Sequence, residues 1–155
     1  MEPIQTPITG REDKKIVAGP LAALSEFYEA FNGADIEKMS GNWMRTPEAA
    51  MDNPLGGIKR GWDEIRPVYE RIFSGPASVY VEFYDYTIHE GTDLFYAVGR
   101  ERGEFRLNGI TIELAIRTSR IYRRAGGSWL QVHHHGSIDD PELLSRYQNA
   151  VRNGR

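Results

Sequence analysis

TSRIYRRAGGSWLQVHHHGS, residues 118–137, is the stretch that decides the fold of this chain. Two runs rich in β-branched and aromatic residues flank an Ala-Gly-Gly turn, which is the pattern of an antiparallel hairpin. Because side chains alternate across a strand, the second run divides into two faces. One face holds Trp129, Gln131, His133, His135 and Ser137. The opposite face holds Leu130, Val132, His134 and Gly136. A β-bulge in this strand would shift the assignment of residues to the two faces.

The chain before this hairpin is predicted to form helices first and strands afterwards. Apolar residues recur at helical spacing over residues 21–31 and 62–72. Asp35 can cap a short helix between them, and the turn-rich residues 53–57 indicate a small hairpin. The short glycine-containing links between the later strands require antiparallel pairing, so the sequence predicts an α+β domain. The three preceding segments with strand character are SVYVEFYDYTIHEG (78–91), LFYAVGRERGEFRL (94–107) and ITIELAIRTSRIYRR (110–124).

Composition indicates one soluble globular domain. The chain has 155 residues, of which 40% are hydrophobic and 26% charged, and its formal net charge is -3. Mixed charge of this kind gives no basic footprint for nucleic acid, and no apolar run is long enough for a membrane helix. The absence of cysteine excludes disulfides and thiolate chemistry. We expect a cytoplasmic protein with a mobile arm at residues 1–18, a domain at 19–142 and a carboxy-terminal tail at 143–155.

The quoted hairpin resembles the carboxy-terminal hairpin of SnoaL-like proteins. These belong to the nuclear transport factor 2-like and ketosteroid isomerase-like superfamily, and the hairpin is also similar to the association domain of calcium/calmodulin-dependent protein kinase II. MDNPLGGIKRGWDEI, residues 51–65, resembles the superfamily's strand, turn and glycine before its third helix. The resemblance covers roughly residues 20–140. It implies a nuclear transport factor 2-like or cystatin-like cone, in which a curved antiparallel sheet and about three amino-terminal helices enclose a pocket.

The same resemblance argues against steroid isomerisation. That reaction requires a carboxylate base together with an oxyanion hole of a tyrosine and a protonated aspartate. Alignment with the family motif places Asn53 at the position of the base, and an amide cannot accept the proton. The tyrosine position falls on Phe27, with Tyr28 adjacent, and the second acid falls near Thr118. We therefore expect that the chain is not a ketosteroid isomerase.

Alternation along residues 110–124 selects the side chains that would face the pocket. The set Leu114, Ile116, Thr118, Arg120 and Tyr122 is more apolar than the set Glu113, Ala115, Arg117, Ser119 and Ile121, so Arg120 is predicted to point inward. By resemblance, an arginine at this position of the kinase association domain lies in the pocket, where it can meet a carboxylate. The alternative is an internal salt bridge to Asp52, Glu82 or Glu113. Gly136 stands where that family places a second arginine.

These residues complete a predicted binding site for a small, partly apolar organic molecule, with an acid as one option. Aromatic side chains would form its walls, although aromatics at such spacings commonly belong to the core. The candidate ligand-binding residues are Arg120, Trp43, Asn53, Tyr69, Phe83, Tyr96, Thr118 and Tyr122.

The three consecutive histidines allow several interpretations. His133 and His135 lie about 7 Å apart along one face, which would suit one metal ion. A third ligand, such as His89 or a carboxylate, is not supplied by any sequence pattern, so we expect neither a metal nor another cofactor. The histidines can instead make structural hydrogen bonds, or one of them can act as a general base. The candidate catalytic residues are His133, His135 and Tyr28.

Two classes of function remain open. One is a pocket protein with isomerase, cyclase or hydrolase chemistry on a small-molecule ligand. The other is a non-catalytic oligomerisation module. Apolar or aromatic residues at both parities of residues 78–88 indicate a sheet covered on both sides, which predicts a homodimer or a higher homo-oligomer.

Overall fold

The computed structural model describes residues 1–154, and it confirms the α+β class with helices preceding the long strands. Short helices and a hairpin occupy the first half of the chain, and four strands of 10 to 16 residues dominate the second half. The elements are α1 (Gly19–Asn32), α2 (Ile36–Asn42), β1 (Ala50–Asp52), β2 (Ile58–Arg60), α3 (Trp62–Ser74), β3 (Ser78–Glu90), β4 (Leu94–Leu107), β5 (Ile110–Ala125), β6 (Ser128–Ser137) and α4 (Pro141–Asn153).

Local capping explains where two of the helices begin. The Asp35 side chain accepts a hydrogen bond from the Lys38 backbone N–H at 3.0 Å, as its position predicts, and so starts α2. Asp140 caps the backbone N–H groups of Glu142 and Leu143 in the same way, with Pro141 as the first helical residue. The segment after residue 142, expected to be a tail, is therefore mostly a helix.

All six strands form one sheet in the order β2-β1-β6-β5-β4-β3. Neighbouring strands are antiparallel except β1 and β6, which run parallel. The parallel pairing places Asp52 beside His135 and Ala50 beside His133. Residues more than 80 positions apart in the chain thus become neighbours.

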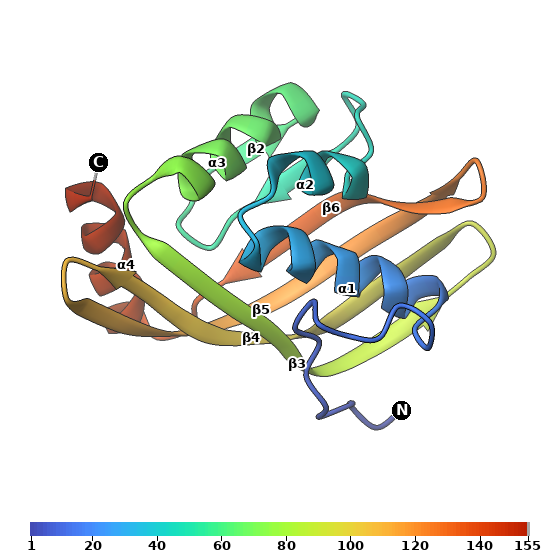
Figure 1. Ribbon diagram of the computed structural model, residues 1–155, viewed down its shortest axis with the longest axis horizontal. Coiled ribbons are helices and arrows are strands. Elements are labelled where there is room, and N and C mark those ends of the chain that lie inside the picture. The colour runs from blue at the N-terminus through green and yellow to red at the C-terminus, as the bar shows by residue number, and fades with distance from the viewer. Residues whose placement is uncertain (155) are drawn as a thin grey trace.

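The sheet has one covered face and one exposed face. In Figure 1, α1, α2 and α3 lie over the same side of the sheet, which we call the inner face. Burial alternates along β4 and β5, and it confirms the inward set predicted for β5. The buried residues of this set are Leu114, Ile116, Thr118, Arg120 and Tyr122. Their neighbours on the other side, which we call the outer face, are mostly exposed.

The amino-terminal segment, for which the sequence predicts a mobile arm, lies along the free edge of β3. Ile4 pairs with Tyr86 and Ile8 pairs with Phe83 through backbone hydrogen bonds of 2.8 to 3.1 Å. Ile8 is only 1% exposed. Unpaired N–H and C=O groups of an edge strand readily bind an extended segment, and periodicity in a short segment does not report such pairing.

Two glycines of β4 allow β3 to approach it closely. A Cβ atom at Gly103 would lie 1.8 Å from the Tyr80 carbonyl oxygen, and one at Gly99 would lie 2.6 Å from the Tyr86 Cβ. The pairing of β3 with β4 also shifts between Tyr84 and Thr87, which is a bulge in β3. Bulges and glycines bend strands, so these positions curve the sheet around the helices.

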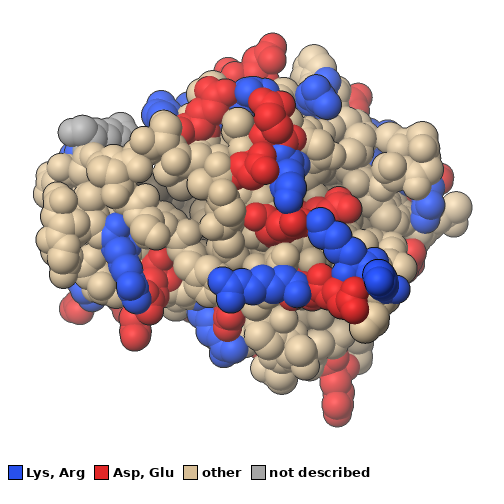
Figure 2. Space-filling view, in the orientation of Figure 1, with Lys and Arg blue, Asp and Glu red and all other residues tan. Residues whose placement is uncertain are grey.

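Charge on the helix-covered side is mixed. Figure 2 shows acidic and basic side chains interspersed over this side of the molecule, with no single-sign patch. Among residues 1–154, no helix is long and apolar enough to cross a membrane.

Candidate functional site

A β-bulge divides the histidine-rich strand differently from the simple alternation. Ile121 pairs with His133, but the next residue of β5, Tyr122, pairs with Gln131, so β6 carries one extra residue at Val132. Gln131 and His134 are therefore both buried, whereas His133 and His135 lie on the outer face. The prediction that Gln131 shares a face with these two histidines is wrong, because the bulge reverses the alternation between them.

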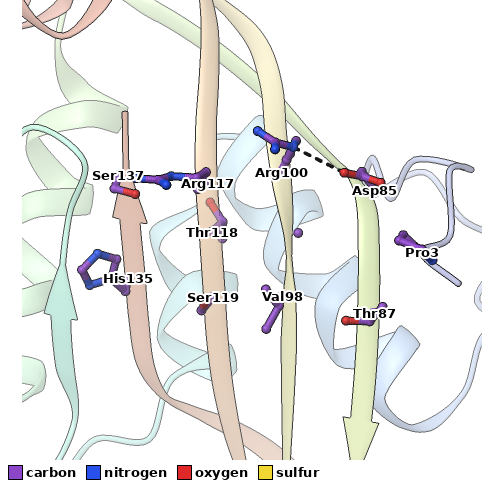
Figure 3. A pocket seen from close by; sticks show the side chains of 11 residues that line it. Pro3, Asp85, Thr87, Val98, Arg100, Arg117, Thr118, Ser119, His135 and Ser137 are labelled. Atoms are coloured by element: carbon purple, nitrogen blue, oxygen red, sulfur yellow. Dashed lines mark hydrogen bonds and ion pairs between the residues drawn. The ribbon is translucent and has the colours of Figure 1, made fainter. Parts of the chain in front are cut away.

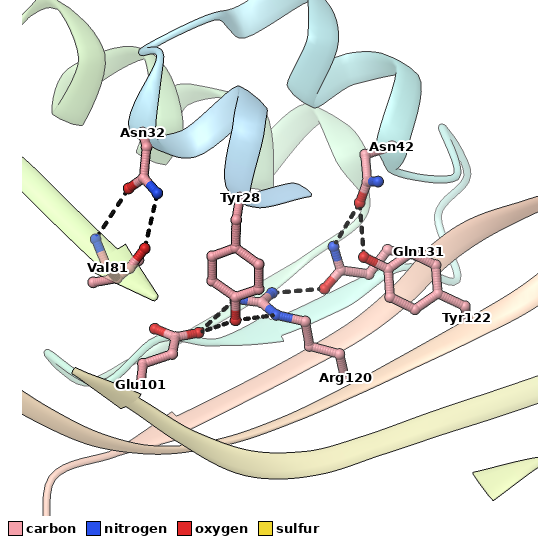
Figure 4. A network of polar contacts seen from close by, with 8 residues as sticks. All are labelled: Tyr28, Asn32, Asn42, Val81, Glu101, Arg120, Tyr122 and Gln131. Carbon is pink, nitrogen blue, oxygen red and sulfur yellow. Dashed lines mark hydrogen bonds and ion pairs between the residues drawn. The ribbon is translucent and has the colours of Figure 1, made fainter. Parts of the chain in front are cut away.

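The inner face holds a buried polar network centred on Arg120 (Figure 4). The Arg120 guanidinium donates to the Glu101 carboxylate at 2.8 Å and to the Gln131 side-chain oxygen at 2.8 Å. Its Nε group lies 3.4 Å from the Tyr28 hydroxyl, which itself donates to Glu101 at 2.8 Å. The guanidinium also stacks 3.6 Å from the centre of the Phe27 ring. The charge of Arg120 is thus neutralised by partners within the chain.

Asn42 at the end of α2 ties the network to the helices. Its side-chain oxygen accepts hydrogen bonds from the Tyr122 hydroxyl at 2.9 Å and from Gln131 Nε2 at 3.2 Å. Its amide donates to the Ala23 carbonyl oxygen of α1 at 2.9 Å. A hydrogen-bonded chain therefore links α1, α2, β5 and β6 through the interior, and a fully satisfied network of this kind fixes their relative positions.

Burial and charge shift the ionisation of this network. Burial raises the pKa of Tyr28 well above its ordinary value, although the charge of Arg120 opposes the shift. Burial likewise raises the pKa of Tyr69 to about 12. For Arg120, burial alone would lower the pKa, but the surrounding oxygens of Tyr28 and Glu101 outweigh it and raise the pKa. These tyrosines are therefore neutral and Arg120 is charged at neutral pH.

The salt-bridge interpretation of Arg120 is correct in kind but not in partner. The carboxylate is Glu101, rather than Asp52, Glu82 or Glu113. Glu82 binds Arg102 and Asp52 binds His135, both with partly exposed side chains. Glu101 stands alone among small and apolar residues on the inward side of β4, and a single acid on such a face is the signal that could have identified it.

Most other predicted ligand-binding residues are packed in the interior. Trp43, Tyr69, Phe83, Thr118 and Tyr122 are each at most 3% exposed, and of these five only Thr118 borders the open hollow described below. Several of their rings contact one another: Tyr69 lies against Trp43 and Phe27, and Phe83 stacks on Tyr28.

Two of the predicted ligand-binding residues lie elsewhere. Tyr96 is 41% exposed on the outer face and stacks on His89, with ring centres 4.4 Å apart. Asn53 lies in the turn between β1 and β2, where its side-chain oxygen accepts the Leu55 N–H at 2.7 Å. Neither side chain is part of the interior network, because alternation directs Tyr96 outward and local turn geometry holds Asn53.

Three buried polar atoms have no hydrogen-bond partner among residues 1–154. They are Trp43 Nε1, Thr118 Oγ1 and His134 Nδ1. Burial and the nearby charge of Arg120 lower the pKa of His134 well below its ordinary value, so its imidazole is neutral. Alternation alone placed His134 opposite Gln131, and the bulge instead brings it into the interior. Unsatisfied polar atoms in a protein interior are uncommon, and each needs a physical explanation such as a bound water, a ligand or local strain.

The outer face carries an open hollow of about 340 Å³ between the strands and the amino-terminal segment. Figure 3 shows its lining side chains, with His135 and Ser137 on β6 at one end and Thr87 and Pro3 at the other. Arg100 is paired there with Asp85 at 3.3 Å. The hollow is shallow, because its floor is the surface of the sheet, and Val98 and Pro3 lie among its polar side chains.

His133 and His135 lie close to Asp52 at the side of this hollow. His135 Nδ1 lies 3.0 Å from an Asp52 carboxylate oxygen, and His133 Nδ1 lies 3.0 Å from the Ala50 carbonyl oxygen. The predicted catalytic residues are therefore separated: the side chains of His133 and His135 lie on the outer face of the sheet, whereas Tyr28 is buried on the inner side. Within residues 1–154, Tyr28 lies on the opposite side of the sheet from the two histidines, so the three side chains do not contact one substrate together.

Comparisons with known proteins identify the family of this chain. A family model described as a SnoaL-like domain matches residues 21–141. No curated protein matches the chain.

Solved structures with the same fold include three that are each less than 25% identical to this chain. An association-domain homologue of calcium/calmodulin-dependent protein kinase type II from Thiobacillus denitrificans is 23% identical, with a TM-score of 0.64 over 81% of this chain and 98% of that one. A nuclear transport factor 2-like protein from Rhodospirillum rubrum is 18% identical, with a TM-score of 0.66 over 78% and 98%. The kinase hub homology domain from Chlamydomonas reinhardtii is 18% identical, with a TM-score of 0.61 over 77% and 95%.

Proposed function

The chain belongs to the SnoaL-like domain family, and we propose that it acts as a self-associating domain that pairs with a second copy through the outer face of its sheet. The inner face is occupied by the chain's own helices and polar network, which leaves the outer face of β3–β6 as the surface available to a partner. Similarity in fold to a kinase association-domain homologue and to a hub homology domain supports this choice.

The observation that carries the proposal is the arrangement of like charges across β4 and β5. Arg100 lies directly opposite Arg117, and Glu104 lies directly opposite Glu113, all on the outer face. Like charges facing each other across strands are destabilising in an isolated sheet. Arg100 forms an ion pair with Asp85, and Glu104 forms one with Arg106, which reduces the repulsion. Arg117 and Glu113 have no ion-pair partner within residues 1–154.

A two-fold arrangement would turn both repulsive pairs into attractive ones. Arg100 and Arg117 form an arginine row across the two strands, and Glu104 and Glu113 form a glutamate row. The two rows are four residues apart along the strands, or about 13 Å. Consider two copies stacked with their outer faces together and related by a two-fold axis that lies between the sheets. If this axis runs perpendicular to the strands at the level of Arg102, each arginine row lies over the partner's glutamate row. Isologous interfaces have this self-complementary form, and complementary charge fixes their register.

Exposed apolar side chains next to these rows provide area for burial. Tyr96 and Val98 of β4 are 41% and 43% exposed, and Leu94 is exposed at the same end of the strand. Apolar groups that cluster on a bare sheet surface are typical of interaction surfaces. Their burial would supply the affinity, while the charged rows would select the register.

A charge exchange tests the proposal by sedimentation equilibrium or native mass spectrometry. Wild type is expected to be a dimer, and Arg117→Glu should raise the dimer dissociation constant at least about tenfold, because it places a new carboxylate opposite the partner's Glu113. The double variant Arg117→Glu with Glu113→Arg should restore the dimer. Lys15→Glu, on the exposed amino-terminal segment, is the control for a simple change in net charge. A monomeric wild type, or a double variant no better than the single one, would contradict the proposal.

A second function is favoured by the unpartnered polar atoms of the interior. Thr118 Oγ1 and His134 Nδ1 lie on neighbouring strands of the inner face, and a small, partly apolar molecule with hydrogen-bonding groups would satisfy them once the surrounding side chains move apart to admit it. Denaturing the purified protein and identifying released small molecules by mass spectrometry tests this. The Thr118→Val variant should retain less ligand, whereas Arg102→Met on the outer face should retain as much as wild type. A wild-type protein that releases nothing would exclude this role.

A further inference from the structure

Asp52, His133 and His135 form a cluster whose chemistry the self-association proposal does not use. One nitrogen of each imidazole and one carboxylate oxygen lie within 4.8 Å of one another. The parallel pairing of β1 with β6 creates the cluster, since it places Asp52 beside His135 and Ala50 beside His133. From this geometry we propose that the three side chains bind a divalent transition-metal ion.

The hydrogen bond of His133 prepares this residue as a ligand. Its Nδ1 lies 3.0 Å from the Ala50 carbonyl oxygen. A carbonyl oxygen can only accept a hydrogen bond, so Nδ1 carries the proton. Nε2 of the neutral ring then has a free lone pair that can coordinate a metal ion. Histidine ligands in metal sites commonly donate their other N–H to a backbone carbonyl in this manner, which fixes the tautomer and the ring orientation.

The contact between His135 and Asp52 already has nearly the separation that a shared ion requires. His135 Nδ1 and Asp52 Oδ2 are 3.0 Å apart. Two ligand atoms on a tetrahedral zinc ion, each at about 2.0 Å from it, lie about 3.3 Å from one another. An ion can therefore replace the proton that joins the two side chains, and a nitrogen of His133 lies within 4.8 Å of both of these ligand atoms.

Exposure and ligand type define the ions that would bind. The cluster opens to solvent, with His135 on the wall of the outer hollow, so an ion can enter and can keep one or more water ligands. Two imidazoles and one carboxylate suit zinc, cobalt, nickel, copper or iron(II) rather than magnesium or calcium, which prefer oxygen ligands only. The outer face would thus carry an ion with coordination positions available to a second molecule.

Calorimetric titration of the full chain with zinc chloride tests the site, with cobalt(II) absorption as a second readout of coordination. The protein must be purified without a histidine tag and treated with a chelator. We expect one zinc ion per chain, and an affinity lowered at least about tenfold in His135→Ala, His133→Ala and Asp52→Asn. His89→Ala is the matched control, because it removes a partly exposed histidine that lies outside the cluster and should leave zinc binding unchanged.

Thermal unfolding without metal separates a lost ligand from a damaged fold. The variants should unfold near the wild-type temperature in chelator, and only wild type and His89→Ala should gain stability when zinc is added. Absence of zinc binding by wild type would overturn the proposal, as would ligand variants that bind as tightly as wild type. One ion per two chains would overturn it too, because the three-ligand site belongs to a single chain.

Discussion

The two faces of the sheet each contain an arginine–glutamate pair, and the pairs differ in surroundings rather than in geometry. On the inner face, Arg120 and Glu101 are 2.8 Å apart with side chains 2% and 7% exposed. On the outer face, Arg102 and Glu82 are 2.7 Å apart with side chains 49% and 19% exposed. Water solvates the outer charges whether or not they pair, whereas the inner charges depend on each other. Distance alone therefore does not rank the importance of ion pairs in this protein.

The largest effect is expected from breaking the inner pair. Arg120→Met leaves the Glu101 carboxylate buried without its counter-charge, and it should lower the free energy of unfolding by about 3–5 kcal/mol in urea denaturation. The double variant Arg120→Met with Glu101→Met should recover most of this loss, because no charge is then buried. A single variant that costs less than about 1 kcal/mol would show that the inner pair behaves like the outer one.

The next largest effect is expected at the inner side of β4. Gly103→Ala introduces a Cβ atom that would lie 1.8 Å from the Tyr80 carbonyl oxygen, so the strands must separate, at a cost of about 3 kcal/mol. Gly41→Ala is the matched substitution, because that glycine lies in α2 with no atom within 4 Å of the added Cβ. It should stabilise the protein by up to about 1 kcal/mol. Equal effects of the two changes in urea denaturation would contradict this assignment.

A smaller, pH-dependent effect is expected from His134. Its pKa is depressed in the folded protein, so below the ordinary value of 6.5 the unfolded chain binds a proton that the folded chain does not. Stability is therefore fully present above that value and falls as the pH decreases. Between pH of about 7.5 and about 5.5, wild type should lose up to about 1.4 kcal/mol more than His134→Leu. Denaturation curves with the same slope against pH for both proteins would contradict this.

The smallest effect is expected on the outer face. Arg102→Met should change the free energy of unfolding by no more than about 1 kcal/mol, because both partners remain accessible to water. The difference from wild type should decrease further when salt is added, since exposed charges are screened. A salt-independent loss comparable to that of Arg120→Met would mean that the outer face is shielded from solvent, as a very stable dimer interface would be.

The three histidines show where local pattern stops being sufficient. Simple alternation would put His133 with Gln131 and His134 on the opposite side. The bulge at Val132 reverses the order, so that His134 is buried and neutral while its two neighbours lie outside. A bulge depends on how two strands pair and leaves no clear signal in the residues of one strand. Spacing along β6 alone therefore does not determine which histidine faces the interior.

The sequence by itself determined the elements and the division of β5 into an inner and an outer set. Alternation and turn residues are properties of neighbouring positions, so they could be read directly, and they correctly placed Arg120 inside. Tertiary structure decided which residues meet: Glu101 with Arg120, Asp52 with His135, and Ile8 with Phe83. These partners are between 19 and 83 positions apart. Such contacts follow from strand order and register, which depend on packing of the whole chain rather than on any local pattern.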